Sequence, residues 1–539
     1  MKFNFVYLSA VLSIIISSCQ SDPSQKEIAQ SIELSLIEEI EEDSSLVKVY
    51  SDHEFHPIWI KLGGLSNKGE QFLQELEEVA YDGLEKENYL TEEQAMLLEK
   101  IKESNDLNTH AALEISLSKS FLQLASDLNI GMIDPSTLNI EWKMDRKEPT
   151  MDFLEMLDGI AEGDDLEESL GLLRPKNQKY TDLQALLEKE INRQKEKEEQ
   201  ISSFEGKVEK GDSHKAIPLI RQKLNLTGDL ETQNQEGGEM YDEELFQAVK
   251  NFQSRHGLID DGIIGGDFLS SINYTNSDLI SKLKINLERL RWLPDFTGSD
   301  HNQVIVNIPD YNLFYIQDGD TIFTSKVVVG KEYRQTPVFK SEMTYLVFSP
   351  TWTLPETILW EDAIPSIIED EEYLEKNNMR VLDFEEEEVD YKKIKWDELD
   401  EEEDFPYLIR QAPGEENPLG KVKFMFPNDY YIYIHDSPAQ NLFSQDERTF
   451  SSGCIRMDKP EEFAALLLED VDGWDEKDIL EAMNLEEEKK VDLEEIQEVW
   501  ILYLTIWSDE GTVQVRDDIY EMDMKLGKAM SLPLSDYFL

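Results

Sequence analysis

The sequence has little cysteine and little positive charge. Only two cysteines occur among 539 residues, so a disulfide framework is excluded as the source of stability. Lysine and arginine number 51 against 115 acidic residues, which gives a formal net charge of −64. Nucleic acids are bound largely through neutralisation of their phosphates by basic side chains. We therefore expect no nucleic-acid partner.

The chain nevertheless has the composition of a folded protein. Apolar residues make up 40% of it and aromatic residues 10%, which argues against global disorder. A chain of this length exceeds what one hydrophobic core can organise, so two to four domains are expected.

The N-terminus has the pattern of a targeting segment. Lys2 precedes an apolar stretch at residues 5–16, which is shorter than the roughly 20 residues of a membrane-spanning helix. Ile-Ser-Ser-Cys, ending at Cys19, resembles the lipobox of bacterial lipoproteins. That resemblance implies a signal peptide at 1–18, a lipid on Cys19, a polar tether at 19–34 and, with Gln20 next, an outer-membrane anchor facing the periplasm. An ordinary secretion signal with a chance cysteine is the alternative.

The pattern along the rest of the chain predicts an α+β multidomain protein. Helical spacing, as at Leu34, Leu36 and Ile37, predicts a helical scaffold domain over residues 35–205. A small helical unit follows at 206–275, and residues 276–300 suggest a linker helix. Within the unit at 206–275, residues 252–265 have the pattern F-Q-x-x-H-G-L-x-x-D-G-x-x-G. This pattern resembles the three-helix peptidoglycan-binding domain.

Short strand-like runs begin after residue 300. They predict a mainly β catalytic domain at 301–525 and a C-terminal tail at 526–539. Strands stop between about 350 and 420, where twelve acidic residues lie between Phe384 and Asp404. A long interruption of this kind predicts a lid, and the charge run favours a solvated surface.

The second cysteine lies in the run S-S-G-C-I-R-M, residues 451–457. His435 precedes Cys454 by nineteen positions, close enough in sequence to act as the base that a thiol nucleophile requires. Gly453 permits close approach of a substrate carbonyl to backbone N–H groups, which would bind an oxyanion. Arg456 would bind a carboxylate or hold the loop. The alternatives are a structural cysteine beside an unrelated histidine, and a Cys19–Cys454 disulfide.

This motif, preceded by I-H-D-S-P-A at 434–439, resembles the active site of the L,D-transpeptidase family. Further similarity to the large multidomain branch of that family lies at 57–59, 82–84, 334–339, 410–414, 417–424 and 514–520. The resemblance implies that Cys454 is the nucleophile and His435 the general base, oriented by a backbone carbonyl. Asp436 stands where many relatives have glycine. Ser452 stands where many relatives have histidine, so a side-chain donor from that position to the oxyanion would be a hydroxyl.

The resemblance also implies the reaction. Cys454 would attack the amide between the diamino acid and D-alanine of a peptidoglycan tetrapeptide stem, releasing D-alanine and forming a thioester. A neighbouring stem amine would complete a 3→3 cross-link, whereas water would yield a trimmed tripeptide. Trp352, Arg410 and Asn417 are the lid residues expected to face substrate. The implied partners are peptidoglycan, the membrane through the lipid, and other wall-synthesis enzymes.

Three other interpretations are open to the sequence. Ser116 and Lys119 match the S-x-x-K of penicillin-binding enzymes, but no K-T-G follows. His53 and His56 do not form an H-E-x-x-H zinc motif, and we expect neither a metal ion nor a cofactor. A non-catalytic lipoprotein that anchors the wall is the rival from another class.

Overall fold

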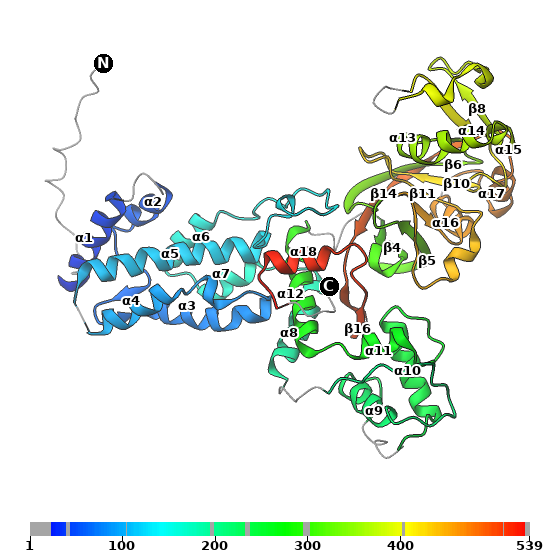
Figure 1. Cartoon of the computed structure of the whole chain (residues 1–539). Helices are drawn as coiled ribbons and strands as arrows, with labels where there is room; N and C mark the ends of the chain where they lie inside the picture. Colours follow the sequence, from blue (N-terminus) through cyan, green and yellow to red (C-terminus); the bar gives the residue numbers. More distant parts are fainter. Residues whose placement is uncertain are drawn as a thin grey trace, which may run out of the picture. The chain divides into compact units, whose positions relative to one another are not determined.

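The structure is a computed structural model that describes most of the chain. The described residues are 23–38, 44–103, 105–193, 199–231, 238–294, 302–400, 405–469, 471–509 and 511–533. They divide into two compact units (Figure 1). The first contains residues up to 132, 147–176 and 187–191, and the second contains 133–146, 177–186 and the rest of the chain. Cys19 lies outside the described residues.

The first unit is a helical bundle around the long helix α5 (Leu107–Ile130). Its other elements are α1 (Pro23–Glu38), α2 (Ser44–Asp52), the hairpin β1 (Ile60–Lys61) and β2 (Gly64–Leu65), α3 (Asn67–Glu78), α4 (Glu92–Glu103), α6 (Phe153–Glu162) and α7 (Leu166–Leu173). Trp59, Phe72 and Phe121 pack against one another in the core, with ring centroids 5.0 to 6.1 Å apart.

A buried carboxylate organises the loop before this hairpin. Glu114 of α5 accepts hydrogen bonds from the N–H groups of Ile58, Trp59 and Ile60 and from the hydroxyl of Tyr50. Burial raises the pKa of Glu114 to about 7, and these hydrogen bonds act against the rise. Glu114 therefore holds the segment at 57–59, one of those that resemble the family, through backbone N–H groups.

Helix α1 shows that the tether predicted at 19–34 was wrong for residues 23–34. Ile28 and Ile32 are fully buried in the scaffold core, together with Leu36. Their spacing of four residues places them on one helix face. Leu34 and Ile37, on which the sequence prediction relied, are 64% and 50% exposed. The scaffold boundaries predicted at 35 and 205 also differ, because residues 133–146 and 177–186 belong to the second unit. Those at 177–186 form the start of α8 (Gln178–Asn192).

The predicted three-helix domain is present in the second unit. It contains α9 (Ile217–Leu226), α10 (Glu243–Arg255) and α11 (Gly266–Ile272), packed around a single core. Gln253 holds the following turn by donating to Asp261 and the Ile263 carbonyl and accepting from the Gly262 N–H. Gly262 has φ +72°, and a Cβ there would overlap the ring of Phe246. The motif residues are thus explained by the fold.

The predicted linker helix is instead the buried helix α12 (Asn276–Trp292). Its cationic side chains look solvent-facing in the sequence, but they are neutralised internally: Arg289 and Lys282 pair with Asp523, and Arg291 with Glu288. Asp523 lies in α18 (Met522–Ala529), whose Leu526 is fully buried. The first part of the tail predicted at 526–539 is therefore packed helix, whereas residues 534–539 lie outside the described residues.

The region predicted to be the catalytic domain is a closed barrel. Its strands run in the order β12-β5-β13-β11-β10-β6-β14-β3-β4, and β4 also pairs with β5, which closes the ring. The strands are β3 (Gln303–Asn307), β4 (Asn312–Gln317), β5 (Asp320–Gly330), β6 (Phe339–Phe348), β10 (Val422–Met425), β11 (Ile434–His435), β12 (Thr449–Ser451), β13 (Ile455–Met457) and β14 (Lys489–Leu502). Eight of these strands form the closed ring, and β12 pairs with β5 outside it.

Two helices and a separate hairpin complete this region. The helices are α16 (Pro460–Leu467) and α17 (Glu476–Ala482), and the hairpin pairs β15 (Ile506–Asp509) with β16 (Thr512–Val515). The continuous strand predicted at 500–507 is therefore two strands in different sheets. The strand predicted at 430–434 is assigned only at its end, because Tyr431 has φ +57° and is 85% exposed.

The predicted lid at about 350–420 is a small folded subdomain. It contains a three-stranded sheet, β7 (Trp352–Thr353), β9 (Leu408–Gln411) and β8 (Met379–Leu382), with α13 (Glu356–Ile358), the π-helix η6 (Leu359–Ala363), α14 (Ile364–Glu369) and α15 (Tyr373–Lys376). Leu374, Val381 and Ile409 belong to a core of its own. The described part of the acidic run, 384–400, is mostly exposed; residues 401–404 lie outside the description.

Candidate active site

Two adjacent parallel strands bring the predicted nucleophile and base together. β11 pairs with β13 so that His435 is the register partner of Arg456, and Cys454 immediately precedes β13. Because partners in a parallel pair present their side chains to the same face, the histidine and the start of the cysteine strand share one region of the barrel. The sequence spacing of nineteen residues therefore becomes a neighbouring position in space.

His435 is buried and held through one ring nitrogen. Its Nδ1 lies 2.6 Å from the carbonyl oxygen of Asp436. A carbonyl only accepts, so Nδ1 carries the proton, and the neutral ring leaves Nε2 with a free lone pair. Burial and the positive charge of Arg456 lower the pKa of His435 to about 3, although the carbonyls of Asp436 and Leu419 act in the opposite direction. The imidazole is thus a neutral base at physiological pH.

Cys454 is a protonated thiol in this resting arrangement. Burial raises its pKa to about 11, while Tyr433 and the charge of Arg456 partly offset the rise. Its Sγ lies 3.7 Å from the carbonyl oxygen of Tyr431. Among the described residues, the Cys454 Sγ makes no hydrogen bond to the imidazole of His435. Thiolate formation therefore requires proton transfer when substrate binds.

The loop before Cys454 fixes its own backbone. The Gly453 N–H donates to Ser451 Oγ at 3.1 Å, and the Gly453 carbonyl accepts from Thr336 Oγ1 at 2.8 Å. Gly453 has φ +110°, which favours glycine. Of the N–H groups around Gly453 and Cys454 that were predicted to bind an oxyanion, that of Gly453 already has an acceptor in this conformation. The Cys454 N–H makes no hydrogen bond to a described residue. It is therefore more available than the Gly453 N–H to donate to an oxyanion.

Asp436 does more than supply a carbonyl. Its carboxylate accepts the N–H groups of Lys421 at 2.8 Å and Ser437 at 2.6 Å. A Cβ on Gly420 would overlap this carboxylate, and Gly420 has φ +63°. The position where the resemblance raised doubt is therefore occupied by a side chain that is fixed on two sides.

The remaining predicted residues lie in different settings. Ser452 is exposed and its hydroxyl accepts a hydrogen bond from Arg334 at 2.8 Å. Asn417 is buried and donates to the carbonyls of Pro350 and Ala412, so it holds the base of the lid and the prediction that it faces substrate was wrong. Arg410 bonds Thr353 and Glu386 within the lid. Trp352 is half-buried and interacts with the Tyr433 hydroxyl.

Two residues of this site were missed from the sequence. Tyr433 lies two positions before His435, and its hydroxyl interacts with the Cys454 sulfur. The alternation of a strand, which puts residues two apart on one face, would have pointed to it. Arg334 reaches Ser452 across 118 residues, and no local pattern in the sequence indicates that contact.

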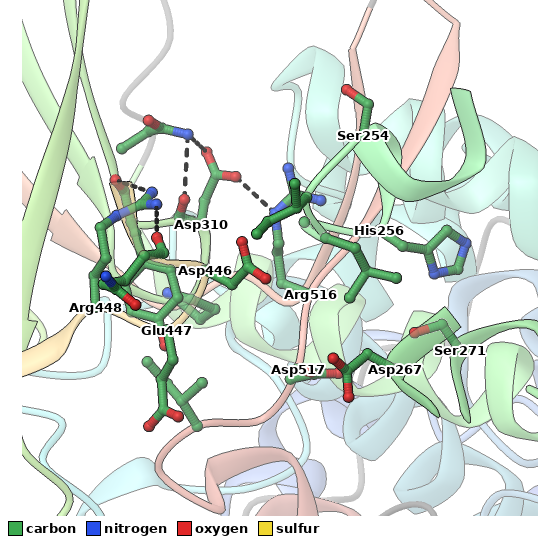
Figure 2. A pocket seen from close by; sticks show the side chains of 18 of the residues that line it. Ser254, His256, Asp267, Ser271, Asp310, Asp446, Glu447, Arg448, Arg516 and Asp517 are labelled. Atoms are coloured by element: carbon green, nitrogen blue, oxygen red, sulfur yellow. Dashed lines mark hydrogen bonds and ion pairs between the residues drawn. The ribbon is translucent and has the colours of Figure 1, made fainter. Parts of the chain in front are cut away.

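A separate cleft of about 890 Å³ lies between the three-helix domain and the barrel (Figure 2). Neither Cys454 nor His435 lines it. Arg516 spans it, donating to Asp310 at 2.7 Å and to the Arg255 carbonyl at 2.8 Å, while Arg448 donates to the Tyr311 carbonyl at 3.1 Å. Arg516 therefore joins the small helical domain to the barrel, whereas Arg448 bonds within the barrel region.

Within the described ranges, no group of three or more His, Cys, Asp or Glu side chains is placed to hold a metal ion. None of the helices described there combines the length and apolar character needed to cross a bilayer.

Comparison with known families identifies the barrel. Residues 301–479 match the family described as the L,D-transpeptidase catalytic domain. By this match, the barrel is similar to L,D-transpeptidase catalytic domains. Residues 44–187 match a scaffold domain, and residues 213–272 match a domain described as "Putative peptidoglycan binding domain". The predicted resemblance and the predicted α+β multidomain fold are both confirmed.

A curated relative supports the assignment over half of its length. It is a Haemophilus influenzae protein described as "Putative L,D-transpeptidase", 36% identical over 253 residues. The match covers 47% of this chain and 50% of that protein. The chain thus spans about half the length of this transpeptidase relative.

Solved L,D-transpeptidase structures are more distant. One from Xylanimonas cellulosilytica is 12% identical with a TM-score of 0.18, covering 56% of this chain and all of that one. Another, from Stackebrandtia nassauensis, is 13% identical with a TM-score of 0.20, covering 58% of this chain and all of that one. The similarity of the barrel to this family rests on the domain match and not on these two structures.

Proposed function

We propose that the protein is a peptidoglycan L,D-transpeptidase that forms 3→3 cross-links through a thioester on Cys454. The observation that carries the proposal is the neutral His435, held at Nδ1 by the Asp436 carbonyl, on the strand beside the one that Cys454 immediately precedes. This is the nucleophile, base and orienting group that an acyl transfer needs. The peptidoglycan-binding domain supports a polymer substrate.

The first half-reaction forms the thioester. His435 Nε2 takes the thiol proton as Sγ attacks the carbonyl carbon at the L-centre of the diamino acid. The Cys454 N–H is the donor available to the developing oxyanion, with the Tyr433 hydroxyl beside the sulfur. Collapse breaks the amide bond, and His435 returns the proton to the nitrogen of the departing D-alanine.

The second half-reaction consumes the thioester. The side-chain amine of a neighbouring stem loses a proton to His435 and attacks the thioester carbon, and Cys454 leaves as the thiol. A new amide replaces the old one, so no external energy source is needed. If water attacks instead, the product is a tripeptide, which is the carboxypeptidase alternative.

The test separates these activities. Incubation with a carbapenem, followed by intact mass measurement, is expected to show one covalent adduct on the native protein and none on Cys454→Ala. Absence of the adduct on the native protein favours the non-catalytic wall-anchoring alternative. Incubation with tetrapeptide muropeptides then distinguishes the two enzymatic activities. Dimers with free D-alanine indicate cross-linking, and tripeptides alone indicate carboxypeptidase trimming.

The proposal extends to location. We infer that Cys19 carries lipid and that the protein acts at the periplasmic face, anchored in the outer membrane, where other wall enzymes supply tetrapeptide donors. The support is the sequence resemblance to a lipobox. Labelling with a fatty acid in cells tests it: Cys19→Ala should lose the label, and a labelled Cys19→Ala would refute it.

A further inference from the structure

Arg334 lies at the edge of the candidate active site, where it contacts the loop before Cys454. It follows β5, and its guanidinium NH1 donates to Ser452 Oγ at 2.8 Å, two residues before the nucleophile. The same group pairs with two lid carboxylates, Glu361 and, at 3.2 Å, Asp362. Arg334 therefore links the nucleophile loop to the π-helix η6 of the lid.

The backbone around Arg334 is held against the nucleophile loop. Thr336 Oγ1 donates to the Gly453 carbonyl and accepts the Gly330 N–H, and the Tyr520 hydroxyl donates to the Gly330 carbonyl. Tyr520 and Thr336 are buried. The arginine is thus carried by a rigid support, whereas its two carboxylate partners belong to a separately folded insertion.

The guanidinium of Arg334 has one N–H without a partner among the described residues, and its two carboxylate partners are exposed. The side chain of Arg334 is only 10% exposed, and its Nε is buried without a hydrogen-bond partner among the described residues. Glu361 and Asp362 are 50% and 58% exposed. Ion pairs to carboxylates that water reaches so easily are individually weak and readily exchanged. Arginine presents a planar fork that matches a carboxylate in a bidentate geometry.

We propose that Arg334 is a binding site for the terminal carboxylate of the donor stem, and that Glu361 and Asp362 occupy it when the lid is closed. This inference rests on the proposed function. In a tetrapeptide donor the D-alanine carboxylate lies three bonds from the carbonyl carbon that Cys454 attacks. A cation beside Ser452 is placed to receive it, and the incoming carboxylate would displace the lid pair. The ligand class is a D-amino acid with a free C-terminal carboxylate.

The test compares two donors that differ only in that charge. One is a disaccharide tetrapeptide ending in D-alanine, and the other ends in D-alaninamide. The native protein should release D-alanine from the first with kcat/KM at least about tenfold higher, because a charge-assisted pair is lost with the amide. Arg334→Gln should bring the two values within about twofold by slowing only the carboxylate donor, whereas Arg334→Lys should keep part of the preference.

Controls separate binding from folding. Arg380→Gln removes an exposed lid arginine that pairs with Glu388 at 3.9 Å and should keep the native preference. The double variant Glu361→Gln, Asp362→Asn should raise kcat/KM for the carboxylate donor, because the competing lid groups are neutral. Neutral iodoacetamide should label Cys454 of Arg334→Gln at the native rate, which reports an intact site.

The outcomes are distinguishable. Native protein that releases product from neither donor overturns the proposed function together with this site. Native protein that turns over both donors equally, or Arg334→Gln that keeps a tenfold preference, overturns the carboxylate site and leaves the transpeptidase proposal standing.

Discussion

The Nδ1 atom of His435 lies 2.6 Å from the carbonyl oxygen of Asp436, the residue that follows it. This single contact fixes the imidazole tautomer, because the carbonyl accepts and Nδ1 must donate. It also makes the main chain the orienting group, so no acidic side chain has to point at the histidine.

The protonation state of the pair predicts an unusual pH profile. The pKa of Cys454 is raised to about 11 and that of His435 is lowered to about 3, mainly by burial. Thiolate therefore accumulates only as the pH approaches 11. Alkylation of Cys454 by iodoacetamide should keep rising through pH 9 and 10, with no inflection near 6.5. A plateau by pH 8 would contradict a buried neutral pair.

Asp436 should act as a positioning residue. Asp436→Asn keeps an oxygen that accepts one of the N–H groups of Lys421 and Ser437, whereas Asp436→Ala removes both bonds. We expect Asp436→Ala to lower kcat by about tenfold or more with little change in KM, since a displaced base affects the transition state. Asp436→Asn should recover most of the loss. Equal kcat in the native protein and the alanine variant would show that the carboxylate is dispensable.

Gly420→Ala tests the same carboxylate from the other side. A Cβ there would overlap Asp436, and φ +63° disfavours alanine in any case. Gly414→Ala is a control for strain alone, because its φ is +156° and a Cβ would contact nothing within 4 Å. We expect the Gly420 variant to reduce kcat and the Gly414 variant to affect it far less. Similar kcat in both would mean that the contact with Asp436 has no effect.

Tyr433→Phe removes the hydroxyl beside the sulfur. That hydroxyl favours the thiolate and lowers the pKa of Cys454. Its loss should raise the thiol pKa further and reduce the acylation rate by about a hundredfold, the lower end of the effect of removing one hydrogen-bond donor at such a site. Stopped-flow measurement of carbapenem acylation at pH 7 and 9 checks this, and an unchanged rate at both would remove Tyr433 from the site.

The scaffold should lose stability as the pH rises. The pKa of Glu114 is about 7 in the fold, above its ordinary value of 4.5, so the stabilising form is protonated. The contribution is complete below about pH 4.5 and is lost as the pH rises through about 7, a change of about 3 kcal/mol. Hydrogen exchange of the Ile58, Trp59 and Ile60 amides, corrected for intrinsic rates, should show weaker protection at pH 8 than at pH 5. Glu114→Gln should abolish that difference; persistence of it would assign the effect to another group.

The sequence predicted what depends on local pattern. The S-S-G-C-I-R-M run pointed to Cys454, and the spacing of nineteen residues pointed to His435. In the structure His435 lies on β11, and Cys454 immediately precedes the neighbouring strand β13. The motif at 252–265 likewise pointed to the three-helix domain, in which Gly262 has φ +72°.

What depends on tertiary partners was not predictable. Lys282 and Arg289 look solvent-facing, and only Asp523, more than two hundred residues later, shows why they are buried. Leu34 and Ile28 are both apolar residues of α1, and packing against the scaffold core decided which of them is buried. Arg334 could not be assigned because its partners in the lid and the nucleophile loop are distant in sequence.

The central claim is that Cys454 becomes acylated by a tetrapeptide stem. The most direct measurement is rapid acid quenching of the protein with a tetrapeptide muropeptide, followed by intact mass and peptide mapping. We expect a mass gain equal to the donor minus D-alanine, located on Cys454 and absent from Cys454→Ala. A protein that releases D-alanine while carrying no acyl group on Cys454, or carrying one on another residue, would contradict it.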